Sequence, residues 1–282
     1  MTSPTIDYVP VGGLGNRMRA IAGAIELGRQ TGQPVRIVWF PDAGLGCRFG
    51  QLFLPLQAEG VSLREATPAD YLLLDRPRPR NLFIPRLWQR LRYSLRIEER
   101  TTAAGMYAGR DFVSWIKGRH TWMASYHYFH SLTIPQGIYT PFRPLPHLQQ
   151  RIDAMAAKLG DHPVGIHIRR TDHVQSIEES PTDAFIRRMQ QLPPETRFYL
   201  ATDDEHEKET LRKAFPNRVF TAESKAERGS LSGMEDALVE MYILARTHLI
   251  LGSAGSSFSA TAANIGNIQL EIVEEERQEP ST

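Results

Sequence analysis

Residues 163–202 read PVGIHIRRTDHVQSIEESPTDAFIRRMQQLPPETRFYLAT. This stretch holds two continuous apolar runs, VGIHI and FYLAT, which are typical of strands buried on both faces of a sheet, and a helical pattern near 182–192 separates them. The alternation continues toward the C-terminus with a helix near 205–214, RVFTA at 218–222, a helix near 233–246, HLILGS at 248–253, a helix near 256–264 and QLEIV at 269–273. Five strands alternating with four helices predict a parallel sheet covered by helices on both faces.

A second strand, helix and strand pattern opens the chain. Apolar runs at 8–11 and 35–40 flank a glycine loop and a helical pattern at 19–31, as in a βαβ unit. Between 49 and 149 the pattern is irregular, and only the alternating segment 121–129 predicts a further strand.

The length of 282 residues suits two ordinary domains better than one. The domain boundary is expected just before the regular alternation of strands and helices begins. We predict domains at 1–155 and 156–272 and an acidic tail at 273–282.

The composition is that of a folded, nearly neutral protein. Lys and Arg number 33 and Asp and Glu 32, which argues against nucleic acid as the main partner because phosphate binding needs a basic surplus. Cys47 is the single cysteine, so neither a disulfide framework nor a thiolate zinc cage can form within the chain. The first twenty residues show no signal-peptide pattern and no membrane-spanning run, and we expect a cytoplasmic, bacterial protein.

Two adjacent arginines follow the strand VGIHI. Ligands of parallel α/β sheets bind beyond the carboxyl ends of the strands, where Arg169 and Arg170 stand. Two guanidiniums can fork onto a diphosphate and neutralise the charge that grows as a glycosidic bond to phosphate breaks, and Asp172 could hold one arginine in place. A surface ion-pair cluster would give the same sequence.

Serines and paired acids follow two other apolar strands. Ser253 ends one strand, and Ser256 and Ser257 then run into a helical pattern, where backbone N–H groups and hydroxyls can bind phosphate. A plain serine N-cap explains the same residues. Asp203 and Asp204 follow FYLAT and indicate a metal or ribose site, although Asp204 is equally suited to cap the next helix.

The helix expected at 233–246 is apolar nearly all round and contains a carboxylate. Glu240 has apolar neighbours such as Ile243 and Leu244, a costly position unless the carboxylate is paired or receives strong donors. The N1–H and N2–H₂ edge of guanine offers two parallel donors to one carboxylate. A buried ion pair with an arginine is the alternative, and Asp236, one turn earlier, is the rival candidate for the guanine contact.

The glycine loop near the N-terminus allows a close approach of backbone to a ligand. Gly13, Leu14, Gly15 and Asn16 form this loop, and side chains would collide with a ligand where glycine does not. Tight turns explain most glycine loops, so this loop alone is weak evidence.

Four segments taken together resemble, in the same order, the motifs of the fucosyltransferases that use GDP-fucose. These segments are GGLGN near the N-terminus, IHIRRTD, YLATDD and VEMYILARTHLILGSAGSSFS. The likeness is nearest to the α1,6-fucosyltransferases, which include the rhizobial nodulation enzyme, and more distant to the α1,2- and protein O-fucosyltransferases. Four motifs in order are far more specific than any one of them.

The resemblance implies a GT-B-type glycosyltransferase fold with two Rossmann-like domains. The donor, GDP-fucose, would bind in the C-terminal half and the acceptor largely in the N-terminal half. The resemblance also implies inversion at the anomeric carbon, with no metal ion and no other cofactor. Leu14, Gly15 and Asn16 match a loop that closes over the diphosphate.

The resemblance also assigns roles to single residues of the C-terminal half. Arg169 matches the family's essential diphosphate-binding arginine, with His167 and Asp172 as its supports. Ser256 matches the phosphate-binding serine. Glu240 falls where the family usually has an aspartate that reads guanine.

The segment after RRTD departs from the family pattern. Where the α1,6 enzymes have a lysine and, four residues later, a glutamate, this chain has His173 and Ile177. Glu178 and Glu179 are adjacent, so a one-residue shift restores the acid. We therefore expect the general base at Glu178 or His173, and a weak base suffices if cleavage of the sugar–phosphate bond runs ahead of attack.

The segment 85–98 predicts a basic amphipathic helix. Leu87, Trp88, Leu91 and Leu95 fall on one stripe, and arginines lie off it. Such a helix can dock on the inner face of a membrane or hold an anionic acceptor. The alternative is that its apolar stripe packs on its own domain.

Three functional hypotheses remain. The leading one is inverting, metal-independent transfer of fucose from GDP-fucose to a hydroxyl of a glycan, a lipid-linked or another small acceptor. The second is transfer of another deoxyhexose such as rhamnose, since the arginine and serine contacts recognise only the diphosphate. The third is a nucleotide-sugar-binding protein without turnover, because the lysine is missing and the glutamate displaced.

Overall fold

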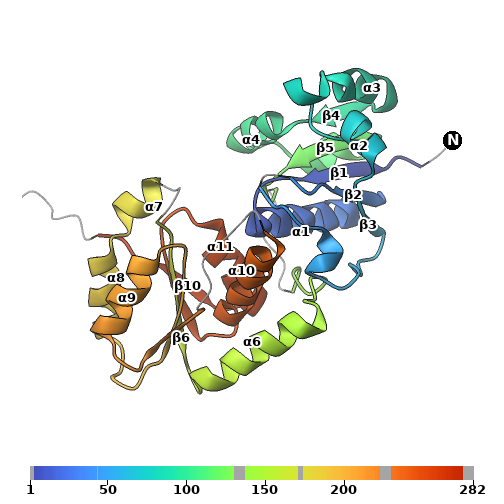
Figure 1. Cartoon of the computed structure of the whole chain (residues 1–282). Helices are drawn as coiled ribbons and strands as arrows, with labels where there is room; N and C mark the ends of the chain where they lie inside the picture. Colours follow the sequence, from blue (N-terminus) through green and yellow to red (C-terminus); the bar gives the residue numbers. More distant parts are fainter. Residues whose placement is uncertain (1–2, 43, 130–136, 171–173, 223–229, 276–282) are drawn as a thin grey trace, which may run out of the picture. The chain divides into compact units, whose positions relative to one another are not determined.

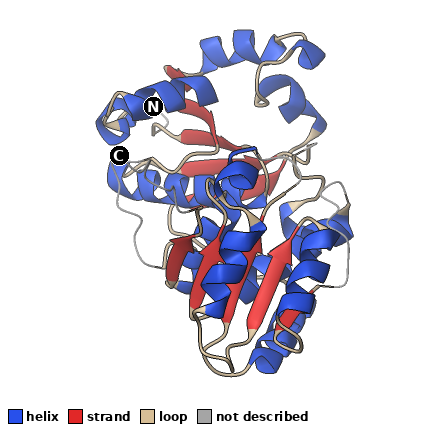
Figure 2. Ribbon diagram, turned by 90° about the vertical axis from the view of Figure 1, so that its left-hand side faces the viewer, coloured by secondary structure: helices blue, strands red, loops and turns tan. Residues whose placement is uncertain are grey.

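The computed structural model describes residues 3–42, 44–129, 137–170, 174–222 and 230–275. The chain divides into two compact units, Met1–Leu145 with Gly229–Leu231 and Pro146–Arg228 with Ser232–Thr282. Each unit is built around one five-stranded sheet with helices packed against it (Figure 1 and Figure 2). Among the described helices, none combines the length and the apolar character needed to cross a membrane.

The first unit contains a parallel sheet with the strand order β3-β2-β1-β5-β4. Its strands are β1 (Ile6–Pro10), β2 (Val35–Trp39), β3 (Val61–Glu65), β4 (Leu95–Ile97) and β5 (Thr121–Ser125). Its helices are α1 (Leu14–Thr31), α2 (Pro68–Leu73), α3 (Ile84–Arg92), α4 (Glu99–Tyr107) and α5 (Phe112–Ile116), with short 3₁₀ turns η1 (Phe49–Gln51) and η2 (Pro79–Asn81). The central strands β1 and β5 are buried along their whole length, as continuous apolar runs require.

The second unit contains a parallel sheet with the strand order β10-β9-β6-β7-β8. Its strands are β6 (Val164–Ile168), β7 (Phe198–Thr202), β8 (Val219–Thr221), β9 (Leu249–Gly252) and β10 (Gln269–Ile272). Its helices are α6 (Pro146–Leu159), α7 (Val174–Glu179), α8 (Thr182–Gln190), α9 (Glu205–Ala214), α10 (Leu231–Leu244) and α11 (Ser257–Gly266). The five strands and four of these helices were predicted from the sequence, and the parallel sheet is confirmed.

Helix α1 begins earlier than predicted, at Leu14 instead of residue 19. Gly13 is the N-cap residue and has an extended backbone conformation, and its carbonyl oxygen accepts the backbone N–H of Arg17 at 3.0 Å. Gly12 has φ +88°, and a Cβ there would lie only 3.0 Å from Nδ2 of Asn16. Leu14, Gly15 and Asn16 therefore form the first turn of a helix, and the expectation of a loop at these residues is wrong.

Helix α6 belongs to the second unit, so the division lies before the predicted boundary at residue 155. Arg151 in α6 forms an ion pair with Asp236 in α10, and Asp153 accepts a hydrogen bond from Arg246 at 3.3 Å. These contacts hold α6 against the helix that precedes β9. The sequence pattern could not assign α6 because pairs about 90 residues apart are not visible in local periodicity.

The predicted acidic tail begins later than residue 273. Val273 is buried in the second unit, and its N–H donates to the carbonyl oxygen of Gly252 at 3.0 Å. The chain thus continues the edge of the sheet beyond β10. Residues 276–282 lie outside the described part of the chain.

The predicted helix at 85–98 is shorter, and only part of its apolar stripe is exposed. Helix α3 ends at Arg92, and Leu95 lies in β4. Leu87 and Leu91 face solvent, whereas Gln89 is buried because its side-chain N–H₂ donates to two backbone carbonyl oxygens at the end of α2, both at 3.0 Å. Trp88 of the same stripe packs against the core of the first unit, so α3 is a surface helix packed on its own domain, as the alternative predicted, while Leu87 and Leu91 are left exposed.

Candidate functional site

The carboxyl ends of β9, β6 and β7 are joined by hydrogen bonds. These strands are neighbours in the second sheet and run parallel. The backbone N–H of Arg169, after β6, donates to Oγ of Ser253, after β9, at 3.3 Å. The backbone N–H of Arg170 donates to Oδ1 of Asp203, after β7, at 2.8 Å. Residues predicted at three separate strand ends thus lie together at one edge of the sheet.

The guanidinium of Arg170 is held by side chains of two neighbouring helices. Its Nε donates to Oε1 of Glu207 in α9 at 2.7 Å, and Nη2 donates to the hydroxyl of Thr182 in α8 at 3.1 Å. Both side chains of the Arg170–Glu207 pair are nearly buried. A guanidinium held in this way joins α8 and α9 to the end of β6. Arg170 thus forms the ion pair that the alternative interpretation predicted, and the contact of Arg169 with a diphosphate stays a prediction.

The strand end beside Arg169 is tightly supported. The ring of His167 in β6 is buried and stacks on Phe258 of α11, with ring centroids 4.9 Å apart. The carbonyl oxygen of His167 accepts hydrogen bonds from the N–H of Ser253 at 3.1 Å and from its hydroxyl at 3.3 Å. Ser253 is fully buried, so its side chain supports the loop from inside. Arg169 itself is half-buried on this rigid base.

Ser256 is the N-cap of α11, as the plainer interpretation predicted. Its hydroxyl accepts the N–H of Phe258 at 3.3 Å. Gly255 turns the chain with φ +69°, a conformation that favours glycine, and the N–H of Ala254 donates to the Ser180 hydroxyl at 2.9 Å. Ser257 opens the helix. The positive end of a ten-residue helix therefore begins just beyond β9, a position suited to phosphate oxygens.

The paired acids after β7 have structural partners. Asp204 is the N-cap of α9, and its Oδ1 accepts the N–H of His206 at 2.7 Å and that of Glu207 at 3.4 Å. The N-cap interpretation of Asp204 is thus confirmed, while Asp203 accepts the N–H of Arg170. Within the described ranges, no group of three or more His, Cys, Asp or Glu side chains is arranged to hold a metal ion.

Glu240 is a carboxylate without a hydrogen bond or ion pair to the described part of the chain. It lies in α10, and Lys208, Asp236, Asp203 and Arg151 are the charged groups close enough to influence it. Burial raises the pKa of Glu240 to about 8, with Lys208 opposing the shift. The acid is therefore costly in the free protein and open to donors from a ligand.

The rival acid, Asp236, is already paired. Its Oδ1 accepts a hydrogen bond from Nη2 of Arg151 in α6. An ion pair with an arginine, the alternative considered for Glu240, is thus found one turn earlier in the same helix, where Arg151 is partly exposed to solvent.

The predicted general bases are only partly described. His173 lies outside the described residues, as does Asp172, which was predicted to support Arg169. Glu178 is exposed in the last turn of the short helix α7. The carbonyl oxygen of the next residue, Glu179, accepts the N–H of Glu275 at 3.0 Å.

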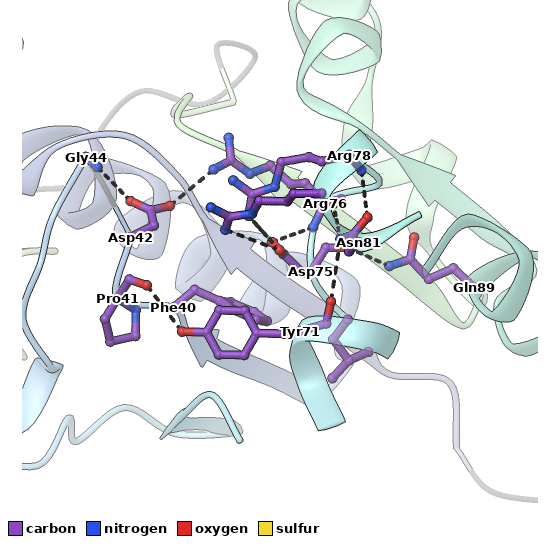
Figure 3. A network of polar contacts seen from close by, with 12 residues as sticks. Phe40, Pro41, Asp42, Gly44, Tyr71, Asp75, Arg76, Arg78, Asn81 and Gln89 are labelled. Atoms are coloured by element: carbon purple, nitrogen blue, oxygen red, sulfur yellow. Dashed lines mark hydrogen bonds and ion pairs between the residues drawn. The ribbon is translucent and has the colours of Figure 1, made fainter. Parts of the chain in front are cut away.

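The strand ends of the first unit hold a separate polar network around Asp42 and Asp75 (Figure 3). Fully buried Arg17 donates to the carbonyl oxygens of Gly12 at 2.8 Å and Phe40 at 2.6 Å, and to Asp42 at 2.8 Å. Asp42 also accepts Nη2 of Arg76 at 3.2 Å. The network ties the turn at Gly12 to the residues after β2.

On the other side of this network, Arg78 donates to both oxygens of buried Asp75 at 2.6 Å (Figure 3). The sequence analysis missed Arg17 in this network and Glu207 at the strand ends of the second unit. The signal for Arg17 was present, because it stands on the apolar stripe of α1 with Ile21 and Ala24, in the same way as Glu240 stands in α10.

Solved structures of similar shape cover nearly the whole chain. NodZ α1,6-fucosyltransferase co-crystallised with GDP has a TM-score of 0.62 and 19% identity over 93% of this chain and 92% of that chain. Fucosyltransferase NodZ from Bradyrhizobium has a TM-score of 0.63 at 20% identity, with 93% of each chain covered. The chain has the GT-B fold of NodZ. No protein-family model and no curated protein sequence matches the chain.

Two further GT-B structures extend this similarity. POFUT1 in complex with GDP-fucose has a TM-score of 0.57 and 10% identity, over 96% of this chain and 98% of that chain. A variant of Arabidopsis thaliana FUT1 in complex with GDP has a TM-score of 0.59 and 14% identity, over 99% of this chain and 72% of that chain. At such identities the similarity establishes the fold, and the predicted GT-B fold with two Rossmann-like domains is confirmed.

Proposed function

We propose that the chain is an inverting glycosyltransferase that transfers fucose from GDP-fucose to a hydroxyl of a glycan, a lipid-linked or another small acceptor. The unpaired carboxylate of Glu240 beside the strand ends carries this proposal, in a fold shared with NodZ and POFUT1, which were crystallised with GDP and GDP-fucose. A carboxylate accepts both N1–H and N2–H₂ of guanine. Adenine presents an acceptor where guanine presents N1–H, so the acid favours a guanine nucleotide.

In the proposed reaction, the acceptor oxygen attacks the anomeric carbon of fucose from the face opposite the diphosphate. The new C–O bond forms as the bond from the anomeric carbon to the β-phosphate oxygen breaks, and GDP leaves with the electron pair. Arg169 and the N-terminal amides of α11 meet the negative charge that grows on the diphosphate. The stabilisation is thus greater in the transition state than in the ground state, which accelerates the reaction.

The proton of the acceptor hydroxyl passes to a general base. Glu178 and His173 remain our candidates for this role. A late proton transfer needs only a weak base, since the sugar carbon is already strongly electrophilic once the bond to phosphate is largely broken.

GDP binding is expected to release about one proton per site near pH 7. With its pKa raised to about 8, Glu240 is largely protonated in the free protein at this pH. Guanine donors favour the ionised form and lower the pKa in the complex, so GDP affinity should rise as pH increases toward 8 and level off above it. Calorimetric titration in buffers of different ionisation enthalpy measures the released proton.

The matched control for this titration is Glu240→Gln, which has no proton to release at position 240. Both proteins share the titration of the GDP phosphates, so the difference between them isolates Glu240. Equal proton release and equal pH dependence in the two proteins would show that the nucleotide base does not contact Glu240.

Transfer activity is expected to survive treatment with EDTA. The proposed site meets the diphosphate charge with Arg169 and helix amides, and Asp204 is used to cap α9. Initial rates with and without the chelator check this expectation. Loss of activity that magnesium or manganese restores would instead make Asp203 and Asp204 metal ligands.

A further inference from the structure

The segment 76–97 of the first unit is basic and contains no acidic residue. Its seven arginines are Arg76, Arg78, Arg80, Arg86, Arg90, Arg92 and Arg96, and the nearest acids along the chain are Asp75 and Glu98. The whole chain has a formal net charge of only +1. The positive charge is therefore concentrated locally around η2 and α3. Arg86, Arg90 and Arg92 have no carboxylate partner within the described residues.

Large apolar side chains are exposed on the same segment. Leu82 is 79% exposed, Leu87 67% and Leu91 82%, and Phe83 and Ile84 are also exposed. Helix α3 packs beside α2 and β4 (Figure 1). Leu87 and Leu91 lie one turn apart on one face of this helix, while Pro85 and Gln89 are buried. Exposed apolar groups of this size, gathered in one place, mark an interaction surface.

The backbone that displays these groups is unusual. Leu82 and Phe83 both have positive φ angles, +52° and +54°, a region that bulky residues rarely adopt. The two residues turn the chain from η2 into α3. The guanidinium of Arg86 lies over the ring of Phe83, 5.5 Å from its centre, so basic and apolar groups share one patch.

We propose that this patch, made of Leu82, Phe83, Ile84, Leu87 and Leu91 with Arg80, Arg86, Arg90 and Arg92, docks on an anionic lipid bilayer. The leucine and phenylalanine side chains would enter the boundary between headgroups and acyl chains. The arginines would meet the lipid phosphates. This inference is independent of the proposed sugar transfer.

The charge of the patch distinguishes a bilayer from other occupants. In a symmetric dimer each patch would face its own copy, which would bring unpaired arginines of the two copies together. Nucleic acid would pair with the arginines but would leave the leucines exposed. An anionic bilayer satisfies both kinds of side chain.

Sedimentation with vesicles tests the proposal on the full chain. We expect binding to vesicles of phosphatidylcholine with phosphatidylglycerol at about 0.1 M salt, and much weaker binding to phosphatidylcholine alone or at about 1 M salt. Arg86→Gln with Arg90→Gln should weaken binding about 30-fold, since each arginine near an anionic surface contributes about fivefold. Leu87→Ser with Leu91→Ser should weaken it at least about tenfold.

The matched control pairs Arg100→Gln with Tyr107→Ser in α4, which are exposed residues of the same unit outside the patch. This variant should bind as the unaltered protein does. Absence of binding to anionic vesicles, or equal binding by all variants, overturns the proposal. Sedimentation equilibrium provides a second readout. If the unaltered protein is a dimer and the variant with Leu87→Ser and Leu91→Ser is a monomer, the patch binds a second copy of the chain and the proposal is overturned.

Discussion

Replacing Arg169 with alanine is expected to abolish sugar transfer and to leave the fold intact. Its guanidinium is proposed to meet the charge that develops on the leaving diphosphate, and the loss of such a group in a water-poor site costs about 3 kcal/mol, or at least about 100-fold in kcat. The backbone N–H that joins Arg169 to Ser253 remains in the variant. Initial rates with GDP-fucose measure the loss, and thermal unfolding checks the fold.

The neighbouring arginine provides the contrast. Arg170→Ala removes a nearly buried ion pair with Glu207 and leaves that carboxylate uncompensated, a change that typically costs about 3–5 kcal/mol of unfolding free energy. We therefore expect a marked fall in Tm for Arg170→Ala and little change for Arg169→Ala. Near-normal turnover in the Arg169→Ala protein would rule out the proposed mechanism.

Glu240→Gln is expected to weaken GDP binding by about 2 kcal/mol, or about 30-fold, the usual scale for losing a charged hydrogen-bond partner. Glutamine accepts one guanine N–H but presents its own N–H₂ to the other. Binding of ADP should change little, because adenine does not offer two donors to the acid. Calorimetric titration of GDP, ADP and UDP measures the three affinities.

Asp236→Asn is the matched control for this substitution. It changes the acid one turn before Glu240 by the same chemistry, but Asp236 is paired with Arg151, whose side chain is largely exposed. GDP affinity should therefore change little in the Asp236→Asn protein. If Asp236→Asn carries the loss instead, the rival assignment is right, and if neither variant alters base preference, the nucleotide does not bind at this helix.

The fold of the second unit could be predicted because its local signals are strong. VGIHI and FYLAT are largely apolar and form β6 and β7, each buried along its length. Asp204 is followed by a clear helical pattern and caps α9 as one interpretation required. Because these residues directly follow parallel strands, the sequence predicted that Arg169, Asp203 and Ser253 lie at the same edge of the sheet.

The remaining features depend on contacts between distant residues. Arg170 stands beside Arg169 in the sequence, yet its partner Glu207 is 37 residues away, so only the folded chain separates their roles. The middle region formed short elements such as β4, whose three residues carry no periodicity. In α3, periodicity identified the stripe with Leu87 and Leu91 but could not say whether that stripe is buried or faces solvent.

Donor screening tests the central claim most directly. The protein is incubated with GDP-fucose, GDP-mannose, UDP-sugars or dTDP-sugars, together with mixed glycan acceptors, and the products are identified by mass spectrometry. We predict a fucosylated acceptor and slow hydrolysis to free fucose and GDP with GDP-fucose alone among these donors. Transfer from a dTDP-deoxyhexose would contradict the guanine assignment, and tight GDP-fucose binding with neither transfer nor hydrolysis would contradict the proposal that the chain is an enzyme.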